Sequence, residues 1–175
     1  MKLLSMMLLA TIFLTACSGI PQEARNYYEE GVSLVETGHY SLAIEAYTDA
    51  IEVAPSYADA YASRAFAMRA LGMVDAMEAD IERAFELDPQ NARANVMLGI
   101  LAHDEGDCEV AISYYNLAIA SKSDYANAFN NRALCYESLG NLEQAETDYL
   151  QALELDPDST LIQRNFEIFQ DSQDS

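Results

Sequence analysis

The sequence predicts an all-α protein built from a short helical repeat. Four glycines, Gly38, Gly72, Gly106 and Gly140, are evenly spaced along the chain. The phrases AIEVAP, AFELDP and ALELDP close three units on the same period, and AIASKS closes the other in a weaker form. Self-similarity at a fixed period of about 20 to 50 residues is the signature of solenoid architectures. The fold class expected is therefore a stack of helical units.

Each unit has the pattern of two amphipathic helices joined at its glycine. Glycine adopts the left-handed conformation that ends many helices, and a proline restricts the residue before it and ends the second helix. Small residues such as Gly31, Ala43 and Ala50 recur where the paired helices must approach closely. The pattern resembles the tetratricopeptide repeat from Ala24 to about Pro157. This resemblance implies four helix-turn-helix repeats, at 24–57, 58–91, 92–125 and 126–157.

Residues 158–170 are expected to form a C-terminal capping helix on the fourth repeat. A single helical pair cannot bury its apolar face, so the end of a solenoid needs a cover. The segment places Leu161, Ile162, Asn165, Phe166 and Phe169 on one helical face. An arm that docks into another molecule is the alternative. The tail at 171–175 is predicted to be disordered.

The N-terminal residues 1–16 have the layout of a secretory signal peptide, which is removed from the mature protein. Their apolar run falls short of the roughly 20 residues that a membrane-spanning helix needs. The ending Leu14-Thr15-Ala16-Cys17 resembles the lipobox of bacterial lipoproteins, which implies a lipid anchor on Cys17 and a short linker over 17–23. By the same resemblance, Ser18 after the lipidated cysteine favours the periplasmic face of the outer membrane. The alternative is an ordinary cleaved signal.

The net charge of −20 argues against binding to nucleic acids, because an acidic surface repels phosphate backbones. The same repulsion argues against electrostatic docking on anionic lipids, which leaves a lipid chain as the expected contact with a membrane. Protein partners with basic patches are favoured. An acidic coat that serves only solubility is the alternative explanation.

A partner-binding groove is expected where the first helices of the four units line the concave face, as the resemblance implies. Apolar side chains continue across all four units at these positions, and a contiguous apolar strip on a surface usually marks a contact site. The alternative is that curvature or the capping segment buries these side chains in the core. The predicted groove comprises Tyr28, Val32, Phe66, Arg69, Arg93, Val96, Met97, Ile100, Asn130, Asn131 and Leu134.

Cys108 and Cys135 lie in regions that become neighbours when the third and fourth units stack, so they are a candidate disulfide pair. The alternative is two buried thiols that behave as small apolar groups. His103 with Asp104 and Cys108 matches no standard metal-ligand spacing, so no metal site and no cofactor are expected. No nucleophile has a base at a meaningful spacing and no glycine-rich phosphate loop occurs, so the sequence does not predict an enzyme.

Taken with these features, the resemblance implies a lipid-anchored adaptor of the cell envelope that binds a peptide or helix of another protein in its groove. The chain resembles two kinds of small repeat lipoproteins: those that assist pilus and secretin assembly, and those that scaffold peptidoglycan hydrolases. The alternative is a structural lipoprotein that self-associates and has no peptide-binding groove.

Overall fold

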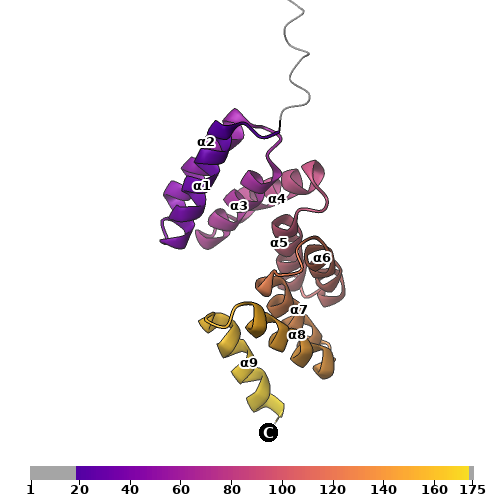
Figure 1. The fold of residues 1–175 in the computed structure, drawn as a ribbon. Coiled ribbons are helices and arrows are strands. Elements are labelled where there is room, and N and C mark those ends of the chain that lie inside the picture. The colour runs from indigo at the N-terminus through magenta and orange to yellow at the C-terminus, as the bar shows by residue number, and fades with distance from the viewer. Residues whose placement is uncertain (1–18, 174–175) are drawn as a thin grey trace, which may run out of the picture.

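The computed structural model describes residues 19–173, and this part of the chain consists of nine α-helices without a β-strand (Figure 1). The first half holds α1 (Gln22–Glu36), α2 (Tyr40–Val53), α3 (Ala58–Ala70) and α4 (Val74–Leu87). The second half holds α5 (Ala92–Asp104), α6 (Cys108–Ser121), α7 (Ala126–Ser138), α8 (Leu142–Leu155) and α9 (Thr160–Gln173). The predicted all-α solenoid of four helical hairpins and one further helix is confirmed. The predicted signal peptide and Cys17 lie outside the described residues.

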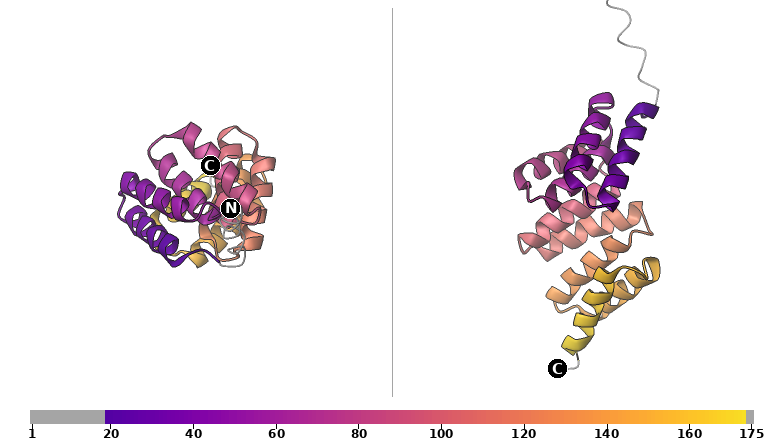
Figure 2. Two further views of the ribbon diagram at one scale, coloured as in Figure 1. Left: turned by 90° about the horizontal axis from the view of Figure 1, so that it is seen from above. Right: turned by 90° about the vertical axis from the view of Figure 1, so that its left-hand side faces the viewer.

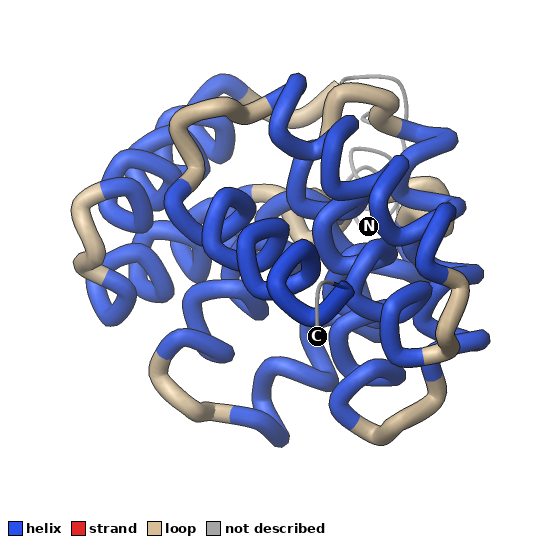
Figure 3. Tube along the Cα trace, turned by 90° about the horizontal axis from the view of Figure 1, so that it is seen from below, coloured by secondary structure: helices blue, strands red, loops and turns tan. Residues whose placement is uncertain are grey.

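Turns of three residues join the two helices of each hairpin, and turns of four residues lead to the next hairpin (Figure 3). The four periodic glycines all have a positive φ, between 73° and 88°. At the first turn the amide of Gly38 donates to the carbonyl of Val35 at 3.0 Å, and the amide of His39 donates to that of Leu34 at 2.8 Å. These bonds satisfy the last carbonyls of α1 and reverse the chain. The repeated glycine therefore sets the same hairpin geometry four times.

Each hairpin buries one large side chain of its second helix against a small residue of its first helix. Tyr47 packs against Gly31 in the first hairpin, and Tyr115 packs against Gly99 in the third. The corresponding large residues in the other two hairpins, Ile81 and Tyr149, are also fully buried. The small residue lets the two helices approach closely, and the large side chain fills the remaining space between them. The core therefore runs as a line through the array.

The hairpins stack so that α1, α3, α5, α7 and α9 contact one another in series. Among the described helices, α2, α4, α6 and α8 make no corresponding contacts with one another. The odd-numbered helices therefore lie on the inner side of the curve and the even-numbered helices on the outer side. Figure 1 shows the resulting bend, with α1 and α9 at its two ends, and Figure 2 shows the elongated stack.

Two arginine–aspartate pairs, in the second and fourth hairpins, join the two helices of their own hairpin. Arg64 on α3 donates to both carboxylate oxygens of Asp80 on α4, at 2.6 and 2.7 Å. It also reaches back to Thr48 on α2 at 3.0 Å. Arg132 on α7 binds Asp148 on α8 in the same way. Each arginine thus joins its own hairpin to the one before it.

Helix α9 covers the end of the fourth hairpin, although its buried face differs from the predicted one. Ile162 and Phe169 are buried, with Phe169 in a cluster with Tyr149. Leu161 was expected on this face but is 57% exposed. The helix also continues to Gln173, so residues 171–173 are helical and not a disordered tail. The Ser172 hydroxyl bonds to the Phe169 carbonyl at 2.7 Å within this last turn.

Candidate binding face and a buried thiol cluster

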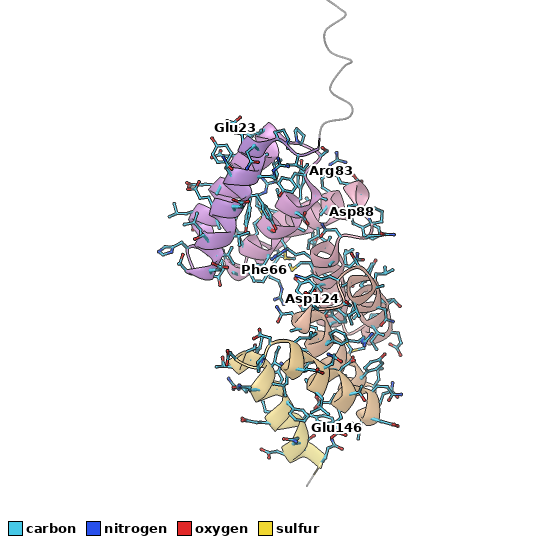
Figure 4. The ribbon with its side chains drawn as sticks, in the orientation of Figure 1. Glu23, Phe66, Arg83, Asp88, Asp124 and Glu146 are labelled. Carbon is cyan, nitrogen blue, oxygen red and sulfur yellow. The ribbon has the colours of Figure 1, made fainter. Side chains whose placement is uncertain are left out.

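Five apolar side chains, each one repeat apart in the sequence, mark the same place on each odd-numbered helix. We call Val32, Phe66, Ile100, Leu134 and Ile168 the inner row. Phe66 is 38% exposed and Ile168 is 55% exposed, whereas the other three side chains are partly buried. Figure 4 shows Phe66 on the inner side of the bend. Such a row of apolar groups on an inner surface offers contacts to a long, narrow ligand.

Ile168 belongs to this row but is absent from the predicted groove. The sequence predicts residues 158–170 as a separate cap, and this prediction does not extend the repeat period past the fourth unit. The structure shows that α9 stands where the first helix of a fifth repeat would stand, since it contacts α7 as α7 contacts α5. Counting one further repeat from Leu134 identifies Ile168 directly.

Three residues of the predicted groove are buried and do not line an open surface. Val96, Met97 and Asn130 are 4%, 1% and 1% exposed. The reason is the seam between successive odd-numbered helices, where Asn165 of α9 donates to the side-chain oxygen of Asn130 at 3.0 Å. The hydroxyl of Ser63 donates to that of Tyr28 at 3.4 Å across an equivalent seam.

The seam joins residues that are 35 positions apart, which is one repeat plus one residue. Val96 occupies the same place in its repeat as Tyr28 and Asn130, and Met97 occupies the same place as Ser63. These side chains therefore point toward the neighbouring helix and pack in the core. The predicted groove is narrower than the sequence indicated.

The remaining residues of the predicted groove keep accessible surface. Arg69 and Asp104 form an exposed ion pair at 3.1 Å, from α3 to α5. Burial raises the pKa of Tyr47 to about 12, and the positive charge of Arg93 partly opposes that rise. The predicted groove residues with partly or fully exposed side chains are Tyr28, Val32, Phe66, Arg69, Arg93, Ile100, Asn131 and Leu134.

A second group of side chains with potential metal-ligating atoms lies where α5, α6 and α7 meet. Both Cys108 and Cys135 are buried and carry free thiols. Their Sγ atoms and a ring nitrogen of His103 all lie within 4.8 Å of one another. Burial raises the pKa of the Cys135 thiol, and a hydrogen bond with Cys108 raises it further. Cys108 and Cys135 are neighbours in the structure, as the stacking of the third and fourth units predicts. A disulfide between them remains a prediction.

In the sequence, Asp104 is the third potential metal ligand beside His103 and Cys108. In the structure, the third potential ligand beside them is Cys135. Asp104 is exposed and paired with Arg69. Cys135 comes from the next repeat, so spacing along one helix gives no sign of it.

Within residues 19–173, no helix is long and apolar enough to cross a membrane.

A curved stack of helical hairpins with an accessible inner face defines the class of solenoid scaffolds that bind other proteins. Sequence patterns of the tetratricopeptide repeat match residues 28–76, 69–126 and 126–159. The chain belongs to the tetratricopeptide repeat family. The structure therefore confirms the fold that the sequence resemblance implied.

Two curated relatives share this repeat region. Small glutamine-rich tetratricopeptide repeat-containing protein 2 of Saccharomyces cerevisiae is 33% identical over 116 residues, which are 66% of this chain and 33% of the yeast protein. Tetratricopeptide repeat protein 36 of Xenopus tropicalis is 30% identical over 113 residues, which are 62% of this chain and 56% of that protein. The chain thus spans between a third and somewhat over half of these relatives.

Several solved structures share the fold at low sequence identity. Pseudomonas aeruginosa PilF superposes with a TM-score of 0.72 at 19% identity, covering 89% of this chain and 71% of PilF. PilW, a type IV pilus biogenesis factor, has a TM-score of 0.66 at 20% identity, covering 78% of this chain and 64% of PilW. YrrB, a repeat protein with an unusual peptide-binding site, has a TM-score of 0.57 at 20% identity, covering 87% of this chain and 79% of YrrB. At these identities the likeness concerns the fold.

Proposed function

We propose that this protein is a non-catalytic adaptor that binds an extended or helical segment of another protein along its inner face. The observation that carries the proposal is the inner row, in which five helices present an apolar side chain at the same place. Two of these side chains, Phe66 and Ile168, are well exposed. Apolar side chains aligned along one face mark a contact site, unlike single exposed residues, so a ligand that covers the row is favoured.

The net charge of the whole chain indicates the chemistry of the partner segment. The chain carries 29 acidic and 9 basic residues, so its field attracts positive charge. The partner segment should therefore have apolar residues that contact the row and lysine or arginine residues beside them.

We also propose that Cys17 carries a lipid and holds the adaptor at the periplasmic face of the outer membrane. The support is the Leu14-Thr15-Ala16-Cys17 sequence followed by Ser18. Two or three acyl chains give stable membrane attachment, because each buried methylene contributes about 0.8 kcal/mol. Among the envelope roles suggested by resemblance, the fold shared with PilW favours pilus assembly over recruitment of peptidoglycan enzymes.

The test is a selection of displayed peptides on the immobilised protein, followed by anisotropy measurements with the best peptide. We expect Phe66→Glu and Ile168→Glu to weaken binding at least tenfold, which corresponds to about 1.4 kcal/mol. Leu150→Glu is the matched control, because Leu150 is 50% exposed but lies on the outer helix α8. Equal losses in all three variants, or unfolding of the two inner-row variants, would contradict the proposal.

Sedimentation of the same variants separates the adaptor from the self-associating alternative. An adaptor stays monomeric over the micromolar range, and the inner-row variants sediment as the wild type does. If the wild type forms dimers and Phe66→Glu abolishes them, the row binds a second copy of the chain and the adaptor proposal fails.

A further inference from the structure

The cluster of His103, Cys108 and Cys135 joins three helices of two successive repeats. His103 lies in the last turn of α5, and Cys108 is the first residue of α6. The turn between them is held by the amide of Gly106, which donates to the His103 carbonyl at 2.9 Å. Asp107 caps α6 by accepting a hydrogen bond from the Val110 amide at 3.0 Å. Two members of the cluster are therefore fixed by one rigid turn.

The third member is positioned by packing between the repeats. Cys135 is fully buried on α7, in one core cluster with Cys108 and Tyr115. All three potential ligand atoms lie within 4.8 Å of one another. A tetrahedral zinc ion with bonds of about 2.0 to 2.3 Å holds its ligand atoms roughly 3.5 Å apart. The side chains need to move by little more than about an ångström to share one ion.

Tyr115 supplies an independent sign that a polar ligand belongs at this place. Its side chain is fully buried, and its hydroxyl has no hydrogen-bond partner among the described residues. A buried hydroxyl without a partner is costly. Tyr115 packs in the same core cluster as Cys108 and Cys135, so a polar group bound at the cysteines is the candidate acceptor.

The charges of the cluster select the kind of ion. Two thiolates and a neutral imidazole around a divalent cation give a complex without net charge, which can be buried at low cost. A monovalent soft cation would leave the same site with a net negative charge in a strongly acidic protein. Thiolate and imidazole ligands together suit zinc.

We propose that His103, Cys108 and Cys135 bind one zinc-class divalent cation, which leaves a fourth position for a water molecule. On binding, each thiol releases its proton to solvent as a sulfur–metal bond forms, and no electron is transferred. The ion connects the α5–α6 hairpin to α7. It thereby fixes the junction between the third and fourth repeats, independently of what the inner row binds.

The test uses the full chain with Cys17→Ser, reduced and kept under anaerobic conditions, with Co²⁺ and then Zn²⁺ as probes. We expect one equivalent of Co²⁺ to produce a thiolate-to-cobalt charge-transfer absorption, and Zn²⁺ to displace it. Native mass spectrometry should show the mass of one zinc ion less two protons. Zinc should also raise the Tm, since only the folded chain brings the three ligands together.

Variants distinguish a built site from adventitious binding to surface carboxylates. We expect His103→Ala to weaken zinc binding at least tenfold and Cys135→Ser to abolish the charge-transfer absorption. His39→Ala is the matched control, because His39 is the only other histidine and lies in an exposed turn. Absence of binding by the reduced chain, or equal binding by wild type and His103→Ala, would overturn the proposal. A Cys108–Cys135 disulfide that re-forms in the presence of zinc would overturn it too.

Discussion

Arg132 and Asp148 form a bidentate ion pair, in which Nε and a terminal guanidinium nitrogen donate to the two carboxylate oxygens at 2.6 and 2.7 Å. The side chains are only 16% and 6% exposed. Arg132 also donates to the side-chain oxygen of Asn116 on the preceding hairpin at 2.5 Å. Arg132 therefore links the two helices of its own hairpin and also connects this hairpin to the preceding one.

Asp148→Ala should reduce the free energy of unfolding by about 3 kcal/mol, because it leaves Arg132 partly buried without its partner. Urea denaturation monitored by circular dichroism measures the loss. Glu86→Ala is the control, since its pair with Arg83 is 65% and 46% exposed and solvent-exposed pairs contribute little to stability. Losses of the same small size at both positions would show that the buried pair has no special role.

Gly31→Ala should destabilise the first hairpin by about 1 to 3 kcal/mol through overpacking. A Cβ atom at this glycine would lie 2.5 Å from Cε1 of Tyr47. The second hairpin carries alanine and isoleucine, Ala65 and Ile81, at the corresponding places. In a Tyr47→Ile background the cost of Gly31→Ala should therefore largely disappear. A double-mutant cycle of unfolding free energies checks this, and additive effects would refute the steric explanation.

Stability should fall at alkaline pH because Tyr47 is buried. Burial raises its pKa from 10.0 to about 12. The folded chain holds this proton more tightly than the unfolded chain does, so the contribution is complete below pH 10 and is lost as the pH rises toward 12. The slope is about 1.4 kcal/mol per pH unit for this tyrosine. Urea titrations at several pH values should show a shallower decline for Tyr47→Phe, and identical slopes would contradict the assignment.

Cys17→Ala should give a chain that folds normally but no longer fractionates with membranes. The reason is that the lipid on Cys17 is the proposed anchor. Circular dichroism and membrane fractionation of cells that express each form provide the measurement. Retention of Cys17→Ala in the membrane fraction would contradict lipid anchoring at this residue. Ser18→Ala is the neighbouring control and should stay in the membrane fraction.

The fold could be predicted because its determinants are local and repeated. A glycine at each hairpin turn and a small residue opposite each large one recur once in every repeat, and each unit needs only its neighbours. One such pair, Gly31 with Tyr47, already specifies how closely two helices approach. The sequence therefore contained the hairpin geometry four times over.

The candidate binding face was only partly predictable because exposure depends on the packing of the next helix. Counting positions along one helix places Val96 and Asn130 on the same side as Phe66. The offset of one residue between successive repeats moves the first two into the seam and leaves Phe66 in solvent. That offset is a property of the stack and is not encoded in a single repeat.

The contacts along the inner seam have a mechanical consequence. Successive odd-numbered helices touch, while the outer helices of neighbouring units do not meet within residues 19–173. Each outer helix instead packs against the first helix of the next hairpin, so both helices of a hairpin hold each junction. Resistance to bending therefore depends on two contacts at every junction, one along the inner seam and one from the outer helix.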